Sequence, residues 1–251
     1  MTEGNRNPWD ECAVAYGQWI ARREQADLSD DPLLSRMLAL LGDVAGREVL
    51  DACSGEGFFA RLLIARGARV TGIDLSPRLI QMAREKDPAG AIDYRVGDLI
   101  GPLPELEGRF DAVASYMALN DVADHQGFAT TLAALVKPGA RVVLAFNNPY
   151  SLLVRGEGHI TDYFARGAMG AYGGLAAAGV KARYYHRTLE DYLDTFLDAG
   201  FRLAKLVDVP DRPARPDRPW LLPKGYVFPR FMILAFEKPV LGAPPLPTRG
   251  D

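Results

Sequence analysis

The feature that most constrains this chain is an apolar run ending in a glycine-rich turn, Val49-Leu-Asp-Ala-Cys-Ser-Gly-Glu-Gly57. A helical pattern, FFARLLIARG, follows at once, so the segment predicts a strand, a tight turn and a helix. Gly55 and Gly57 let a ligand approach the backbone closely. Backbone N–H groups and the positive end of the helix would suit an anionic group there.

Short apolar runs and helical runs keep alternating after this turn, as in βαβ units that build a parallel sheet. The predicted strands are EVLDA (48–52), RVTGIDL (69–75), IDYRVGD (92–98), FDAVASYM (110–117), RVVLAFNN (141–148), FRLAKLVDV (201–209) and FMILAFEK (231–238). A helix is predicted to begin at Pro32, and another, before the fifth strand, to end at 137–139. Thr188 and Asp191 have the spacing of a capping box and predict a further helix start.

Two segments break this alternation. Residues 151–183 are rich in Gly and Ala with scattered aromatic residues, and they follow the fifth strand, where a lid over the sheet edge would fall. Prolines recur every third residue from 210 to 219, the period of a polyproline II helix. The expected organisation is an N-terminal helical cap over the cofactor (1–45), a binding core (46–150), a lid (151–187), completion of the sheet (188–238) and a disordered tail (239–251).

Charge and cysteine content narrow the class of protein. A formal net charge of −3 and a pI near 5.7 argue against nucleic acid as the partner, since binding phosphates needs clustered Lys and Arg. The two cysteines, Cys12 and Cys53, imply no disulfide framework and favour a reducing compartment. No segment has the composition of a signal peptide or a membrane span, so we expect a cytoplasmic protein with no membrane partner.

Acidic residues at the ends of the first three predicted strands indicate what the turn binds. Asp51 precedes the glycines, where a carboxylate would repel a pyrophosphate but suits an ammonium and a sulfonium. Asp74 can accept from two ribose hydroxyls, and Asp98 from an adenine amine. With Ala60, the two glycines also fit the relaxed dinucleotide fingerprint, so a nicotinamide-dependent oxidoreductase stays open as an alternative.

In order along the chain, VLDACSGEG, GIDLS, GDL, FDAVASYMALND and LVKPGARVVLA resemble the motif series of class I S-adenosylmethionine-dependent methyltransferases. The resemblance covers roughly residues 9–238 and is most similar to the group acting on quinones, sugars and natural products. It implies an α/β fold with a Rossmann-like, seven-stranded, mostly parallel sheet whose last strand is antiparallel, with a cap after the fifth strand. The implied cofactor is S-adenosyl-L-methionine, and no metal ligands are assigned.

The resemblance also implies roles for single residues. The residues implied around the cofactor are Asp51, Gly55 and Gly57 for the methionine part, Asp74 and Leu75 for the ribose, Asp98 and Leu99 for the adenine, and Ser115, just after the fourth strand, for the sulfonium end. Cys53 stands where the family usually has Gly, so its side chain must point away or narrow the site. Tyr16, in a segment similar to the stretch that folds over the cofactor, can reach the methionine carboxylate or pack within its helix.

The expected acceptor is a small organic molecule with a flat or apolar part, such as a natural product or secondary metabolite, because aromatic residues gather in the lid. His186, His159 and Asp121 are the candidate catalytic residues for an acceptor that needs a base, and Asp121 could instead hold an amine. His125 is expected to be exposed at a helix start. A protein that binds the cofactor without transferring methyl groups is a further alternative, and a homodimer is left open.

Overall fold

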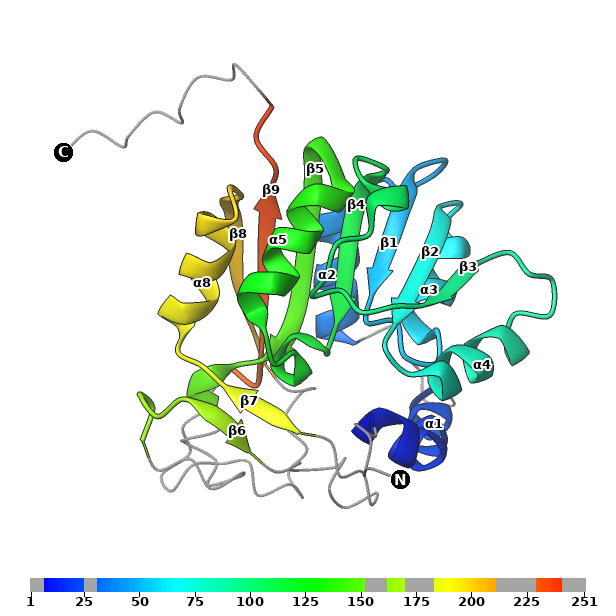
Figure 1. Cartoon of the computed structure of the whole chain (residues 1–251), viewed down its shortest axis with the longest axis horizontal. Helices are drawn as coiled ribbons and strands as arrows, with labels where there is room; N and C mark the ends of the chain where they lie inside the picture. The colour runs from blue at the N-terminus through cyan, green and yellow to red at the C-terminus, as the bar shows by residue number, and fades with distance from the viewer. Residues whose placement is uncertain (1–6, 25–30, 152–161, 170–182, 211–228, 241–251) are drawn as a thin grey trace.

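One large sheet organises the chain (Figure 1). The structure is a computed structural model that describes residues 7–24, 31–151, 162–169, 183–210 and 229–240. The strands of this sheet are β1 Glu48–Ala52, β2 Arg69–Asp74, β3 Asp93–Val96, β4 Phe110–Tyr116, β5 Val136–Asn147, β8 Arg202–Val209 and β9 Phe231–Glu237. All seven overlap strands predicted from the sequence.

The strand order places β1 inside the sheet, between β2 and β4. The order is β3-β2-β1-β4-β5-β9-β8, and β1 pairs in parallel with both β2 and β4. β9 is antiparallel to its two neighbours, β5 and β8, which confirms the predicted antiparallel last strand. Because the chain leaves β1 toward β2 and later returns to β4 on its other side, β1 and β4 flank a topological switch point, where ligands of such sheets bind.

Helices cover both faces of the sheet. They are α1 Pro8–Glu24, α2 Pro32–Leu41, α3 Phe58–Ile64, α4 Pro77–Glu85, α5 His125–Leu135 and α8 Leu189–Asp198, with short 3₁₀ helices η1 Pro104–Leu106 and η2 Leu119–Asp121. The start of α2 at Pro32 and the capping box of Thr188 and Asp191 are confirmed. The helix predicted to end at 137–139 stops at Leu135, because Val136 is extended and pairs with Phe110.

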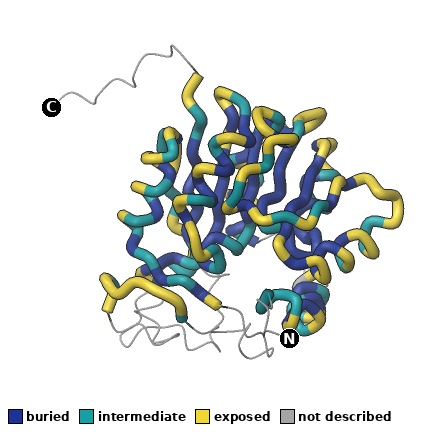
Figure 2. The backbone as a smooth tube through the Cα atoms, in the orientation of Figure 1, coloured by how far each residue is buried: buried dark blue, intermediate teal, exposed yellow. Residues whose placement is uncertain are grey.

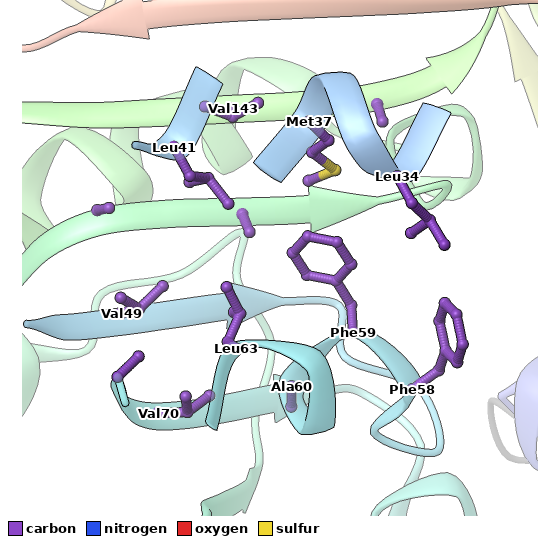
Figure 3. Packing of buried hydrophobic residues seen from close by; sticks show 14 of the residues in the cluster. Leu34, Met37, Leu41, Val49, Phe58, Phe59, Ala60, Leu63, Val70 and Val143 are labelled. Carbon is purple, nitrogen blue, oxygen red and sulfur yellow. The ribbon is translucent and has the colours of Figure 1, made fainter. Parts of the chain in front are cut away.

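Most residues of β1, β2, β4, β5 and β9 are buried (Figure 2). On one face, Met37 and Leu41 of α2 and Phe59 and Leu63 of α3 point toward each other over the sheet (Figure 3). On the other face, α5 and α8 pack on alternate residues of the same strands. Truncating a buried aromatic residue such as Phe59 to Ala lowers the free energy of unfolding by about 3–5 kcal/mol. This core therefore holds the strand ends in fixed positions.

The insertion after β5 contains a second, two-stranded sheet that the sequence did not predict. β6 (Gly167–Met169) and β7 (Tyr184–His186) pair antiparallel. In Figure 1 this small sheet lies at the same end of the molecule as α1, the end at which β1 and β2 stop. His159, the proline repeat beyond Pro210 and the tail beyond 240 lie outside the described residues.

Within the described ranges, none of the helices combines the length and the apolar character that crossing a membrane requires. The same ranges contain no group of three or more His, Cys, Asp or Glu side chains arranged to hold a metal ion.

Candidate active site

The turn after β1 needs its glycines for two different reasons. Gly55 has φ +55°, and a Cβ added there would lie 3.5 Å from Cε1 of Tyr16. Gly57 has φ +84°, and a Cβ there would lie 2.1 Å from the hydroxyl of Tyr94. Tyr94 therefore fills the space beside Gly57 that the sequence assigned to a ligand, whereas Gly55 faces the side chain of Tyr16.

Asp51 is a buried carboxylate with little to balance its charge. It is the fourth residue of β1 and only 1% exposed, and its Oδ2 has no hydrogen-bond partner among the described residues. Burial raises the pKa of Asp51 to about 7, against a lowering by the backbone N–H of Ala60. A positively charged ligand group would stabilise this carboxylate.

Asp74 ties the end of β2 to the glycine-rich turn. Its Oδ2 accepts from the backbone N–H of Gly55 at 2.8 Å and its Oδ1 from that of Ser76 at 2.9 Å. Burial raises its pKa although both hydrogen bonds lower it. The next residue, Leu75, is 51% exposed and so presents an apolar side chain beside the carboxylate.

The third acid lies further out than the sequence indicated. Asp98 is two residues beyond the end of β3 and exposed, and its Oδ1 accepts from the backbone N–H of Ile100 at 3.1 Å. Leu99 between them is buried. The carboxylate of Asp98 thus keeps most of its surface open to a ligand.

Cys53 shows that these acids converge. It has φ +61°, a left-handed conformation that costs a non-glycine residue about 1–2 kcal/mol. The pKa of its thiol is raised well above the usual value, first by burial and then by four charges, those of Asp74, Asp121, Asp51 and Asp98. The Cys53 side chain, predicted to point away or narrow the site, is therefore near acids that lie at or just beyond the ends of four neighbouring strands, β3, β2, β1 and β4.

The β4 side of the site differs from expectation at one residue. Ser115 was predicted just after the fourth strand but is the sixth residue of β4, pairs with Leu144 and is fully buried. Its Oγ has no hydrogen-bond partner among the described residues. Asp121, in η2, is half-buried, and burial followed by the charge of Asp74 raises its pKa well above the usual value.

Both ends of helix α1 are bonded to the elements that follow β1 and β2. Near its start, Asp10 accepts from the hydroxyl of Ser76 and from the backbone N–H of Arg78. At its end, Glu24 pairs with Arg61 at 2.5 Å. Between them, Tyr16 lies over the turn, where burial, Glu56 and other acids raise its hydroxyl pKa, which places this side chain beside the predicted cofactor residues.

The two described histidines are both buried. His186 is 1% exposed; its Nε2 lies 2.8 Å from the carbonyl of Tyr163, and its Nδ1 has no partner in the described part of the chain. The expectation of an exposed His125 is wrong, because its Nε2 lies 2.8 Å from the carbonyl of Leu119 and its ring packs on Tyr192. Burial lowers the pKa of His125 to about 3, so it stays neutral.

Sequence reasoning missed Asn120, a buried hydrogen-bonding centre beside Asp121. Its Nδ2 donates to the hydroxyls of Tyr184 at 3.0 Å and Tyr192 at 2.8 Å, and its Oδ1 accepts from the backbone N–H of Asn147 at 2.9 Å. These bonds join η2 to β5, β7 and α8. The only local signal was a polar residue just after a buried strand.

Sequence reasoning also missed Glu56. This residue lies inside the glycine-rich turn, is 1% exposed and is paired with Lys86 and Arg61. Glu56 is thereby neutralised by the protein itself, unlike Asp51. The carboxylates left for a ligand are those of Asp51, Asp74, Asp98 and Asp121. Such a set fits a ligand with an ammonium, a sulfonium, ribose hydroxyls and an adenine amine, and it disfavours a pyrophosphate.

Comparison with known proteins agrees with this chemistry. Residues 50–144 match the model of a methyltransferase domain family. The ubiquinone biosynthesis O-methyltransferase of Xanthomonas oryzae pv. oryzae is 34% identical over 163 residues, which are 62% of this chain and 68% of that protein. The demethylmenaquinone methyltransferase of Tropheryma whipplei is 40% identical over 112 residues, 44% of this chain, so the chain spans only 46% of that relative.

A solved structure extends the similarity over most of the fold. The crystal structure of an S-adenosylmethionine-dependent methyltransferase from Mesorhizobium loti superposes with a TM-score of 0.66 at 25% identity, covering 81% of this chain and 96% of that one. The nicotinamide alternative rested on three small residues of one turn. The motif order, the sheet and these relatives together show that the chain belongs to the S-adenosylmethionine-dependent methyltransferases.

Proposed function

We propose that this chain transfers a methyl group from S-adenosylmethionine to an O, N or C atom of a small organic molecule at the carboxyl edge of its sheet. The observation that carries the proposal is Asp51, a carboxylate that is 1% exposed, has an oxygen without a partner among the described residues, and precedes the glycine-rich turn. An ammonium group there would replace the missing partner.

The remaining residues divide the cofactor among them. Asp51 and Gly55 would hold the methionine part, and Asp74 the ribose. Leu75, Asp98 and Leu99 would contact the adenine side, Ser115 the sulfonium end, and Cys53 would narrow the site. When bound, the cofactor supplies an electrophilic methyl carbon, so the chain has mainly to align the acceptor and exclude water. The position of Tyr16 over Gly55 supports α1 as the cap that excludes water.

An acceptor that is a neutral amine or a phenolate attacks without much help, but an alcohol or a carbon acid must lose a proton to a base. His186 is a candidate base, because Nε2 beside the Tyr163 carbonyl would carry the proton and leave the Nδ1 lone pair free. Asp121 is the other described candidate. His159 stays a candidate by sequence alone.

Aromatic side chains beside β7 favour a flat acceptor. Tyr163 stacks on Tyr150 with ring centroids 4.8 Å apart, meets Phe164 edge-on at 5.3 Å and lies edge-on to His186 at 5.8 Å. Phe164 is 72% exposed and offers an open ring face. The names of two relatives point to quinone precursors as the first acceptors to try, and natural products remain the sequence-based prediction.

Two measurements test the proposal. S-adenosylhomocysteine should bind and raise the melting temperature, whereas NADH should not. Labelled S-adenosylmethionine should then methylate at least one member of a panel of phenols, quinols, amines and natural products. Absence of S-adenosylhomocysteine binding would overturn the proposal, and binding with no transfer to any member would favour a protein that binds the cofactor without methylating.

A further inference from the structure

Asp121, a candidate base for the acceptor, is the one acid of the site that the cofactor assignment does not use. The proposed function, on which this inference rests, uses Asp51 for an ammonium, Asp74 for the ribose and Asp98 for the adenine amine. Asp121 is half-buried in η2, and its carboxylate has no hydrogen bond or ion pair within the described ranges of the chain. A partly buried carboxylate without a partner is unfavourable, and such groups are common at functional sites.

The position of Asp121 is fixed by its neighbour. Asn120 is 1% exposed, and its amide is bonded to Tyr184, Tyr192 and the backbone of Asn147. The backbone N–H of Asp121 donates to the carbonyl of Ala118 at 2.8 Å. The η2 turn therefore cannot swing the carboxylate toward solvent without breaking buried hydrogen bonds.

Strand order places this carboxylate opposite Asp74. β1 lies between β2 and β4, so Asp74 reaches the glycine-rich turn from the β2 side and Asp121, which follows β4, from the other side. The charges of both Asp74 and Asp121 raise the pKa of Cys53 and of Tyr16. Asp121 thus lies beside the same turn as the acids for the methionine and ribose parts, and sulfur is the atom that joins those two parts.

We propose that Asp121 is a specificity-determining residue that recognises the positive charge on the cofactor's sulfur, so that the chain binds the methyl donor more tightly than the demethylated product. During transfer the acceptor's electron pair forms the new bond to the methyl carbon, and the electrons of the broken carbon–sulfur bond stay on sulfur. Asp121 then faces a neutral thioether instead of a cation. The loss of this charge pair favours product release.

Two stable cofactor analogues test this assignment without an acceptor. S-adenosylhomocysteine is the neutral thioether, and in sinefungin an amino-bearing carbon replaces the methylated sulfur. We expect Asp121→Asn to weaken sinefungin binding about tenfold to hundredfold by calorimetry, the effect of losing one charge-assisted hydrogen bond. The affinity for S-adenosylhomocysteine should change by less than about twofold, which is a smaller effect than the loss of one hydrogen bond.

Asp124→Asn is the matched control. Asp124 lies three residues further on, is exposed, and caps α5 by accepting from the N–H of Gly127 at 2.9 Å, which Asn also does. This variant has the same charge change and should leave both affinities as in the wild type. Thermal unfolding without ligand should show Asp121→Asn to be folded and more stable, because an unpaired carboxylate has been removed.

The wild type gives a second test that needs no variant. The ratio of sinefungin to S-adenosylhomocysteine affinity should fall as pH is lowered, because the pKa of Asp121 is raised and the carboxylate takes up a proton and loses its charge. A ratio independent of pH, or an Asn variant that weakens both ligands equally or neither, would overturn the role of Asp121. Failure of the wild type to bind S-adenosylhomocysteine would instead overturn the proposed function.

Discussion

The two ends of the large sheet use acidic residues in opposite ways. At the amino end of β1, Glu48 pairs with Arg69 at 2.6 Å and with Arg109 at 3.5 Å. At the carboxyl end of the same strand, Asp51 is buried with an unpartnered oxygen. Glu48 at the amino end is thus paired with cations of the protein, whereas Asp51 at the carboxyl end keeps an oxygen that, in the proposed function, a ligand would pair with.

The pKa values follow the same division. The pKa of Asp111, near the start of β4, is lowered. Burial raises this pKa, but the hydrogen bonds from Lys137 and from the backbone N–H of Glu48 lower it by more. Burial raises the pKa of Asp51 and of Asp74. The charges at the amino end therefore stabilise the fold, whereas the buried carboxylates of Asp51 and Asp74 at the carboxyl end destabilise it when they are ionised.

The largest test of this comparison is Asp51→Asn. We expect S-adenosylhomocysteine affinity to fall about 100-fold, since the ligand's ammonium would lose a buried charged partner. Without ligand the variant should melt at a higher temperature than the wild type at pH 8. Calorimetry and thermal unfolding measure the two effects, and an unchanged affinity would remove Asp51 from the site.

Asp74→Ala should separate binding from stability less cleanly. Removing this carboxylate leaves the buried N–H groups of Gly55 and Ser76 without acceptors, at about 1–3 kcal/mol each. We expect weaker S-adenosylhomocysteine binding and a lower free energy of unfolding in urea. Asp98→Ala is the comparison variant. Because the carboxylate of Asp98 is exposed, its removal should weaken cofactor binding without changing the urea midpoint.

The pH dependence gives a smaller, graded effect. A folded-state pKa of about 7 for Asp51, above the unfolded value, means that the ligand-free protein loses stability as pH rises from about 4 to 7. Binding of an ammonium favours the ionised carboxylate, so affinity should rise by up to about tenfold per pH unit below pH 7. Calorimetry in buffers of different ionisation enthalpy should detect proton release at pH 6. A flat profile, equal to that of Asp51→Asn, would contradict the raised pKa.

The smallest effect is expected at the amino end. Asp111→Asn removes a partly exposed pair with Lys137, worth about 1 kcal/mol or less and screened by salt. When both proteins are unfolded by urea in 1 M NaCl, the midpoint of the variant should approach that of the wild type. Cofactor affinity should not change. A loss of affinity would show that the two ends of the sheet are not independent.

Local patterns sufficed to predict the seven strands and the acids at their ends, because each depends on a few adjacent residues. The features that were missed depend on partners far apart in the sequence. Asn120 lies 64 residues before Tyr184 and 72 before Tyr192. His125 was expected at the surface because its own helix start is polar, and its contacts with the Leu119 carbonyl and with the ring of Tyr192, 67 residues away, account for its burial.

Ser115 was placed just after the fourth strand, although the strand predicted at 110–117 already contained it, and the structure keeps it within β4. The β6–β7 pair escaped prediction since each strand has only three residues. The contact between Asp10 and Ser76, which attaches α1 to the start of α4, spans 66 residues and has no local signature. Tertiary packing, not local preference, decides such contacts.

The amide of Asn120 sets a condition on exchanging acceptor segments between relatives of this chain. The stretch between β5 and α8 contains Tyr184, whose hydroxyl accepts from Nδ2 of Asn120. A segment grafted in its place must therefore provide a hydroxyl at the same position. A graft with Phe at that position leaves a buried N–H donor without its partner and loosens the turn that carries Asp121. New acceptor preferences are therefore easier to obtain from grafts that keep this one tyrosine.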